Sequence, residues 1–263
     1  MMSLSQVLTN IKENLNDSNA KLLPTESDCP TCHRILPSYL PNVEAILKER
    51  GQAAPGLESD KWLFCQCPKE RQSRVLLLES RANLPRHDGK ARTFENFQVV
   101  AGTEECFEAS KAFAAGGNPH ILALTGGVGN GKSHLLEAIG HEIIGRGWSV
   151  RYEQVPEFLT RIRMTFNNPD QENPLTCAEL ATVLLLDDVG LEKRSDWTSE
   201  VLTTLVDERY RTGRRLAVAT NLTFEDFVRN GNERLGDRLF DTTSGIVRLA
   251  LNTAPSFRTG RTW

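Results

Sequence analysis

Apolar and polar residues alternate with two different periods between residue 93 and the end of the chain. Short apolar runs bounded by turn residues predict strands at 120–125, 148–154, 182–187, 215–220 and near 246–251. Apolar residues at helical spacing predict helices at 104–115, 132–145, 156–166, 196–211 and within 223–239. Strands that alternate with helices are typical of a parallel sheet covered by helices on both faces. The fold class is therefore expected to be α/β.

The first 92 residues have a different pattern. Helical periodicity is short at 4–15 and 43–50, and a basic helix is predicted at 69–83. Residues 61–92 hold eight Lys and Arg against three Asp and Glu, although the whole chain has a net charge of −3. Such a stretch fits a nucleic-acid or acidic-partner surface and, equally, a solvated helix face. We place a domain boundary near 84–92, which gives domains 1–92 and 93–263.

Composition excludes several classes of protein. Six cysteines in 263 residues are too few for a secreted disulfide scaffold. No apolar run approaches the roughly 18 residues of a membrane span, and the N-terminal segment lacks the apolar core of a signal peptide. We therefore expect a soluble, cytoplasmic protein.

One segment matches a known phosphate-binding pattern. Residues 126–133, GGVGNGKS, fit G-x-x-x-x-G-K-[ST] between a predicted strand and a predicted helix. The glycines let successive backbone N–H groups point at an anion, Lys132 can reach the β- and γ-phosphates, and the Ser133 hydroxyl can ligate Mg²⁺. The predicted ATP site consists of Gly126, Gly127, Val128, Gly129, Asn130, Gly131, Lys132, Ser133 and His134.

Polar residues follow two apolar strands. Asp187 and Asp188 end the run Val183-Leu-Leu-Leu186, and Asn221 follows the strand 215–220. Beside a phosphate loop, Asp187 is the expected magnesium carboxylate and Asp188 the expected water-orienting group. Asn221 can contact the attacking water or the γ-phosphate. The alternative is structural, because Asp is a good helix N-cap and Asn a common turn residue.

Three arginines are candidates for contacts with the γ-phosphate. Arg234 and Arg238 are four residues apart and so share one helix face, from which a guanidinium can reach a neighbouring subunit. The alternative is a set of surface ion pairs with Asp237 and Asp241. Arg258, near the C-terminus, is a weaker candidate for sensing the state of the nucleotide.

Residues 93–263 resemble the AAA+ ATPase domain of the DnaC/DnaI helicase loaders and the related IstB transposition helpers. The matching phrases, in order, are Phe94-Glu-Asn-Phe97, GGVGNGKSHLLEAIG, LLLDDVG, Asp207-Glu-Arg-Tyr210, ATNL and ERLGDRL. The resemblance implies a five-stranded sheet, Walker A at Lys132 and Ser133, and Walker B at Asp187 and Asp188. It also implies sensor 1 at Asn221 and an arginine finger at Arg238, with Arg234 beside it. Asp188 stands where AAA+ proteins commonly have Glu, which fits a slow, switch-like ATPase.

The same resemblance implies a contact with single-stranded DNA. The family carries a DNA-gripping insertion after the second strand, and the equivalent segment here is about 156–179. Arg161 and Arg163 would neutralise phosphates, and Phe166 would stack on a base. The spacing of Phe158, Ile162 and Phe166 also fits core packing, which we expect for the first two.

Four cysteines form two closely spaced pairs, Cys29-x-x-Cys32 and Cys65-x-Cys67. Two such pairs can close a tetrahedral zinc site, with His33 as a possible substitute ligand. The alternative is unpaired buried cysteines, which is the expectation for Cys106 and Cys177. A zinc module before this ATPase resembles the N-terminal domain of DnaI-type loaders, which meets the replicative helicase.

These observations predict an ATPase that uses ATP, Mg²⁺ and Zn²⁺. Its expected partners are the hexameric replicative helicase, single-stranded DNA and further copies of itself in a ring or filament, with no membrane. A first alternative is an IstB-like helper that assembles on duplex DNA and recruits a transposase. A second is an ATP-gated adaptor with little turnover.

Overall fold

The computed structural model describes residues 26–28, 35–37, 68–87, 90–166, 173–193 and 195–259 of the 263-residue chain. Contacts divide the chain into two units, Met1–Arg74 and Val75–Trp263. In the first unit, strands β1 (Glu26–Asp28) and β2 (Ile35–Pro37) pair in antiparallel orientation. The helices expected at 4–15 and 43–50 lie outside the described residues.

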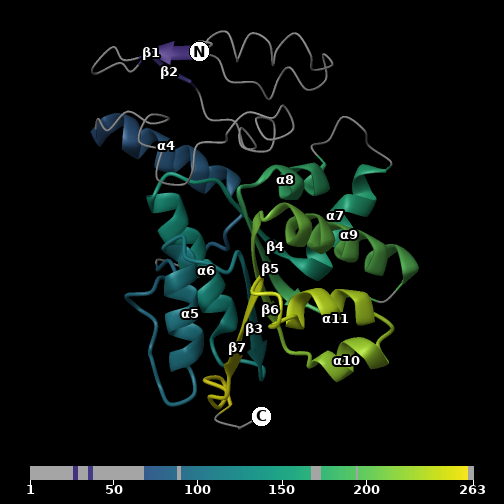
Figure 1. The fold of residues 1–263 in the computed structure, drawn as a ribbon. Coiled ribbons are helices and arrows are strands. Elements are labelled where there is room, and N and C mark those ends of the chain that lie inside the picture. Colours follow the sequence, from purple (N-terminus) through teal and green to yellow (C-terminus); the bar gives the residue numbers. More distant parts are fainter. Residues whose placement is uncertain are drawn as a thin grey trace. The chain divides into compact units, whose positions relative to one another are not determined.

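A five-stranded parallel sheet forms the centre of the second unit (Figure 1). In spatial order its strands are β4 (Val150–Gln154), β5 (Val183–Val189), β6 (Arg215–Thr220), β3 (Ile121–Gly126) and β7 (Val247–Asn252). Every neighbouring pair is parallel, which confirms the predicted fold class. Because parallel strands end at one edge, residues that follow β3, β5 and β6 are brought together there.

Helices cover both faces of this sheet (Figure 1). One face carries α5 (Glu104–Ala114) and α6 (Lys132–Gly145). The other carries α7 (Val155–Thr165), α8 (Pro174–Leu180), α9 (Asp196–Thr212), α10 (Phe224–Arg229) and α11 (Glu233–Phe240). Successive strand residues join opposite cores, with Leu122 on the α5–α6 side and Ala123 on the other. Both faces are therefore buried, which explains why the strands are apolar throughout.

Helix α8 was not predicted as a separate element. Pro174 occupies its first turn, and the Asn173 side chain caps it by accepting a hydrogen bond from the Leu175 amide at 2.9 Å. The fully buried Arg209 of α9 donates to the carbonyl oxygens of Ala178 and Ala181, at 2.5 and 2.9 Å. Burial lowers the pKa of this guanidinium to about 9. Arg209 thus ties the end of α8 to α9.

The segment after helix α4 (Pro68–Arg81) belongs to the second unit. The Tyr152 amide donates to the Ala82 carbonyl at 2.8 Å, and the Asn83 side chain donates to the Tyr152 carbonyl at 2.9 Å. Residues 82 and 83 thereby cover the outer edge of β4, an edge that would otherwise present unpaired backbone groups. Contacts therefore divide the chain earlier than the boundary expected at 84–92. None of the helices that the structure describes is long and apolar enough to cross a bilayer.

Candidate nucleotide site

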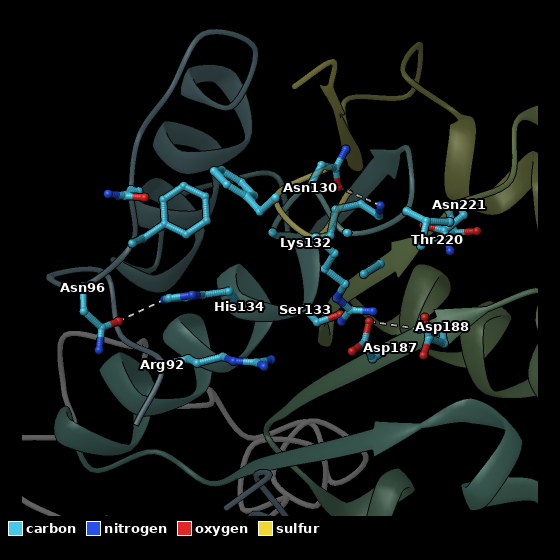
Figure 2. A pocket seen from close by; sticks show the side chains of 18 residues that line it. Arg92, Asn96, Asn130, Lys132, Ser133, His134, Asp187, Asp188, Thr220 and Asn221 are labelled. Carbon is cyan, nitrogen blue, oxygen red and sulfur yellow. Dashed lines mark hydrogen bonds between the residues drawn. The ribbon is translucent and has the colours of Figure 1, made fainter. Parts of the chain in front are cut away.

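A cavity of about 420 Å³ opens at the carboxyl ends of β3, β5 and β6 (Figure 2). It brings together four groups that the sequence singled out separately: the phosphate loop, the two aspartates, Asn221 and Arg258. Residues of the segment that precedes α5 also line it, namely Arg92, Asn96, Phe97 and Gln98. A cavity of this volume is in the usual range for a small-molecule site.

The phosphate loop begins α6 without a side-chain cap. Gly131 is the N-cap residue and has φ of 100°, a conformation that favours glycine, and a Cβ there would lie 2.8 Å from the Phe97 ring. The first backbone N–H groups of α6 therefore remain available to an anion at the helix N-terminus. This geometry is what phosphate binding requires.

Lys132 is held inside the loop by neutral oxygens. Its ammonium donates to the carbonyl oxygens of Gly126 and Gly127, at 2.8 and 2.5 Å, and to Oδ1 of Asn130 at 3.0 Å. The side chain is buried, and burial lowers its pKa to about 8, although Asp187 opposes the shift. A phosphate in the cavity would supply the negative partner that the cradle lacks.

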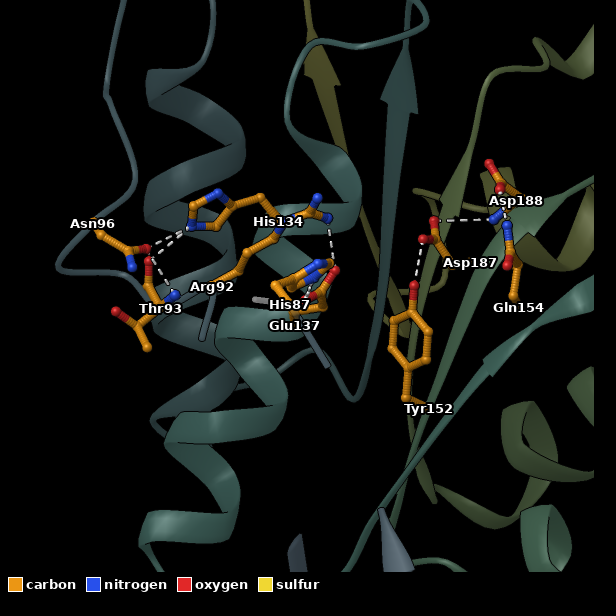
Figure 3. Close-up of polar contacts among 10 residues, drawn as sticks. All are labelled: His87, Arg92, Thr93, Asn96, His134, Glu137, Tyr152, Gln154, Asp187 and Asp188. Atoms are coloured by element: carbon orange, nitrogen blue, oxygen red, sulfur yellow. Dashed lines mark hydrogen bonds and ion pairs between the residues drawn. The ribbon is translucent and has the colours of Figure 1, made fainter. Parts of the chain in front are cut away.

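The two strand-end aspartates have different environments (Figure 3). Asp187 is buried, and it accepts hydrogen bonds from the Tyr152 hydroxyl at 2.6 Å and from the Asp188 amide at 3.0 Å. Burial raises the pKa of Asp187, while hydrogen bonds from Tyr152 and Ser133 oppose that shift. Asp188 is half-buried, accepts from the Gln154 side chain at 2.9 Å and has φ of 56°, which is uncommon for a residue with a side chain.

Ser133 and Asp187 fit a magnesium ion. They lie side by side in the cavity, and their hydroxyl and carboxylate oxygens are ligands that Mg²⁺ prefers. The pair is also close enough for Ser133 to hydrogen-bond Asp187. These are the two residues that would hold the ion, and their assignment stays a prediction.

Asn221 lines the cavity just after β6, across the view from Arg92 and Asn96 (Figure 2). The preceding Thr220 anchors the strand end, because its hydroxyl donates to the Val189 carbonyl at 2.7 Å and accepts from the Leu222 amide at 3.0 Å. Arg258 is exposed at the cavity rim. The structure thus places both residues where contact with a nucleotide is possible.

Arg234 and Arg238 do not line this cavity. Both side chains bind the buried carboxylate of Asp207 on α9; the Arg238 Nε bond measures 2.7 Å. The Arg238 guanidinium also lies over the Tyr210 ring, 4.9 Å from its centroid. Burial raises the pKa of Asp207, but the bonds from Arg238 and Arg234 outweigh it and hold the pKa below its usual value. The alternative considered from the sequence, ion pairs with Asp237 and Asp241, named the wrong partners, because both arginines pair with Asp207.

Sequence reasoning missed a polar cluster on α6 (Figure 3). Glu137 is buried and pairs with His87 at 2.7 Å and Arg92 at 2.8 Å. Burial raises the pKa of Glu137, and the two partners oppose that shift. One turn earlier, His134 Nε2 donates to the Thr93 carbonyl and to Asn96 Oδ1, each at 3.0 Å. These contacts hold His87, Arg92, Thr93 and Asn96 against α6 beside the cavity, and only the phrase that begins at Phe94 hinted at this role.

Tyr152 and Gln154 were also missed, because they belong to a strand that the sequence links to no motif. Their side chains hold the two aspartates, as Figure 3 shows. Burial, reinforced by Asp187, raises the pKa of Tyr152, so its hydroxyl is the donor. Alternation along β4 places both side chains on the same face of the sheet.

The residues singled out near α7 divide into a core set and a set of DNA-contact candidates. Phe158 and Ile162 are buried in the core, as expected. Arg161 pairs with the buried Glu153. Phe166 is 64% exposed with its ring edge-on to Trp197, and the Arg163 guanidinium lies 4.6 Å from the Trp197 centroid.

Two of the cysteine predictions can be examined in the described part of the chain. Cys106 is buried, which raises its pKa to about 12, and Cys177 is half-buried. Cys29, Cys32, Cys65 and Cys67, with His33, lie outside the described residues. Within the described residues there is no group of three or more His, Cys, Asp or Glu that could hold a metal ion. The zinc site therefore stays a prediction.

Comparison with known proteins identifies the family. The sequence profile of the IstB-like ATP binding proteins matches residues 86–245, which include the whole phosphate loop, both aspartates and both α11 arginines. The chain belongs to this family. The resemblance noted from the sequence phrases is thus confirmed, and so is the assignment of this IstB-like chain to the ATP-binding P-loop NTPases.

Relatives of this IstB-like protein include helicase loaders. It is 29% identical to the replicative helicase loader DnaC of Buchnera aphidicola subsp. Baizongia pistaciae over 153 residues, 56% of this chain and 62% of the relative. It is 26% identical to DnaC of Escherichia coli strain K12 over 179 residues, 65% of this chain and 72% of the relative. A crystal structure of the DnaC helicase loader superposes with a TM-score of 0.53 at 19% identity, covering 61% of this chain and 96% of that one. That structural likeness supports the fold.

Proposed function

We propose that this protein is an ATPase that loads the replicative DNA helicase. The observation that carries the proposal is the nucleotide site, complete from Lys132 to Asn221, in a chain whose relatives are named replicative helicase loaders. ATP binding would drive assembly of several copies on single-stranded DNA, and hydrolysis would reset them. Asp188, where AAA+ proteins commonly have Glu, favours slow turnover suited to a switch.

Each wall of the site has a separate task in hydrolysis. Backbone N–H groups at the start of α6 and the Lys132 ammonium bind the phosphates. Asp188 accepts a hydrogen bond from the attacking water, and Asn221 orients that water or the γ-phosphate. When bound at Ser133 and Asp187, Mg²⁺ neutralises phosphate charge. Water adds to the γ-phosphorus, the bond to the bridging oxygen breaks, and the products are ADP and inorganic phosphate.

The arginine positions support action between subunits. Arg234 and Arg238 bind Asp207 outside the cavity that holds Lys132, so a γ-phosphate in their own chain is not their partner in this conformation. We infer that Arg238 contacts the γ-phosphate of a neighbouring copy, with Arg234 beside it. The site then reaches full activity only after assembly.

Phe166 is the proposed base-stacking residue for single-stranded DNA. It is exposed at the end of α7, and Arg163 beside it supplies positive charge. We expect Phe166→Ala to weaken binding of a fluorescent oligonucleotide about tenfold, while Met164→Ala, equally exposed on the same helix, leaves it unchanged. Equal affinities of the two variants would remove Phe166 from the interface.

The N-terminal domain is the proposed helicase-binding part. Cys29, Cys32, Cys65 and Cys67 would hold one structural zinc ion, which a domain of this size can require for folding. Metal analysis of the purified full chain should find about one zinc per chain, and Cys29→Ser with Cys32→Ser should lose it. Full zinc content in that double variant would contradict the assignment.

The deciding test of the proposed function is capture with the full-length chain as bait. Purified replicative helicase and purified transposase are offered separately, with ATP. The Lys132→Ala variant, which is expected not to bind ATP, serves as the control. We expect retention of the helicase and release of the transposase. Retention of the transposase instead would establish the IstB-like alternative.

A further inference from the structure

The last strand of the sheet contacts the phosphate loop through a pair of buried amides. Asn252 ends β7 and Asn130 lies in the loop, and both side chains are buried, with 0% and 1% exposure. Asn130 Nδ2 donates to the Asn252 carbonyl at 3.0 Å, and Asn252 Nδ2 donates to the Asn130 carbonyl at 2.9 Å. The two residues thus bind each other reciprocally across 122 positions of the chain.

The oxygen atoms of the same amides extend this pair in both directions. Asn252 Oδ1 accepts from the Ala254 amide at 3.1 Å, and Asn130 Oδ1 accepts from the Lys132 ammonium at 3.0 Å (Figure 2). A continuous path of hydrogen bonds therefore joins Ala254, Asn252, Asn130 and Lys132. It ends on the cation that is expected to bind the phosphates of ATP.

The phosphate loop packs closely against the end of β7, which restricts how far the loop can move there. A Cβ on Gly126 would lie 2.2 Å from the Asn252 carbonyl oxygen, so the loop passes directly against the strand end. Further along the tail, the Phe257 amide donates to the Gly129 carbonyl at 2.9 Å. The C-terminal segment thus holds the phosphate loop at two places, one of them through the amide of Asn252.

We propose that Asn252 is a positioning residue of the nucleotide site, which acts through Asn130 to orient the phosphate loop and the Lys132 ammonium. The proposal rests on the proposed ATPase function, because Lys132 is taken to bind ATP. Asn252 does not itself line the cavity. Its amide keeps the Asn130 carbonyl turned away from the anion and leaves the Asn130 side-chain oxygen free to hold Lys132.

The isosteric variant Asn252→Asp isolates this role. Its carboxylate still accepts from the Ala254 amide, but the second oxygen faces the Asn130 carbonyl oxygen where a donor stood. Loss of a buried donor, with repulsion between oxygens, should displace the loop and weaken ATP binding about tenfold. Binding of a fluorescent ATP analogue measures this, with circular dichroism as the check on folding.

A double-mutant cycle separates positioning from general destabilisation. Asn130→Ala also breaks the path, so we expect it to weaken ATP binding about as much as Asn252→Asp, and the double variant to be no worse than either single one. Losses that add in the double variant would show that Asn252 does not act through Asn130. Thermal melting of all three variants shows whether stability follows the same pattern, and a merely structural role would make affinity track stability.

The matched control is Asn173→Asp. This residue caps α8 with its side-chain oxygen, a role that Asp retains, and it does not line the cavity. We expect wild-type ATP affinity in the control. If Asn252→Asp does not fold, Asn252→Ser, whose hydroxyl can donate without adding charge, replaces it and should show a smaller loss.

The outcomes distinguish this inference from the proposed function. Wild-type protein that binds no ATP would refute the ATPase proposal itself. A wild-type protein that binds ATP, together with a folded Asn252→Asp variant of equal affinity, would overturn only the role of Asn252.

Discussion

The basic side chains expected to act on ATP are held in two contrasting ways. Lys132 is 6% exposed and donates to three neutral oxygens inside its own loop. The side chains of Arg238 and Arg234 are 35% and 70% exposed and share one carboxylate, that of Asp207. The lysine belongs to a site built within one chain, whereas the arginines are placed where a second molecule can reach them.

The two arrangements differ in the free energy needed to break the existing contacts and bind a new partner. Breaking the contacts of Lys132 without a replacement leaves a buried cation unpaired, so only a ligand in the cavity can take over its bonds. The two arginines share the buried Asp207 carboxylate, so one can leave while the other still pairs with it, and water solvates the exposed guanidinium that is released. The contrast therefore favours two kinds of half-site. Lys132 belongs to a fixed half-site for the protein's own nucleotide, and Arg238 and Arg234 form a movable half-site for the nucleotide of a neighbouring copy.

The largest expected effect comes from removing Lys132, the cation of the fixed half-site. Lys132→Ala should weaken ATP binding by at least about 100-fold, because the phosphates lose their charged partner in a buried site. Titration calorimetry with ATP measures the change. Lys111→Ala on α5, whose ammonium lies over the Phe107 ring, is the control and should bind as wild type. Unchanged affinity in Lys132→Ala would refute the nucleotide site.

Removing Arg238 from the movable half-site should lower ATP turnover and leave ATP affinity unchanged. Arg238→Ala is expected to lower ATP turnover about tenfold or more at concentrations where the wild type assembles, with ATP affinity unchanged. Arg229→Ala, which removes another exposed arginine in an ion pair, is the matched control. Mixing Arg238→Ala with Lys132→Ala chains should restore part of the turnover, since each supplies what the other lacks. Weakened ATP binding in Arg238→Ala would place the residue in its own chain's site.

A smaller effect is expected from changing Tyr152, whose hydroxyl donates to Asp187 beside the fixed half-site. Tyr152→Phe keeps the ring in the core and removes only the hydroxyl that donates to Asp187. The carboxylate loses one of its orienting bonds, so turnover should fall about threefold to tenfold and require more Mg²⁺, with little change in ATP affinity. Tyr210→Phe removes the bond to Asp241, away from the cavity, and should leave the Mg²⁺ dependence unchanged. The same Mg²⁺ dependence in both variants would contradict a positioning role.

The smallest effect is expected at the ion pairs of Asp207 with Arg234 and Arg238. The pKa of Asp207 lies below its usual value in the folded protein, so the carboxylate stabilises the fold above about pH 4 and loses this effect as the pH falls through the lowered pKa. Asp207→Asn should lower the melting temperature by about 2–4 °C at pH 7 and low salt. The difference from wild type should shrink in high salt and below pH 4. A difference that persists at 1 M salt would indicate that Asp207 acts by packing.

Most elements of the second unit could be predicted from the sequence, since their periodicity is strong. The helix expected at 132–145 matches α6 and the strand expected at 215–220 matches β6. Helix α8 was missed because its seven residues are too few for a periodic signal, and it is anchored by Arg209 from a distant helix. The contacts of Asn83 and Arg92 were missed for a similar reason, as their partners Tyr152 and Glu137 are far along the chain.

Within the candidate site, the residues proposed to contact ATP and Mg²⁺ could be predicted from the sequence, and the residues that orient them could not. Lys132, Ser133, Asp187 and Asp188 form compact motifs whose chemistry restricts the residue types. Asn252, Tyr152 and Gln154 are single polar residues at strand ends or within strands, a pattern shared with many residues that have no such role. Their importance comes from the atoms that they meet.

The sequence by itself determined the fold class, the phosphate loop and the two aspartates, because local periodicity and short spacing dictate them. Only the tertiary structure decided which side chains orient those groups, and that Arg234 and Arg238 bind Asp207 away from the cavity that holds Lys132. The physical reason is that hydrogen bonds and ion pairs depend on distances between atoms, and strand order brings together residues as far apart as Asn130 and Asn252.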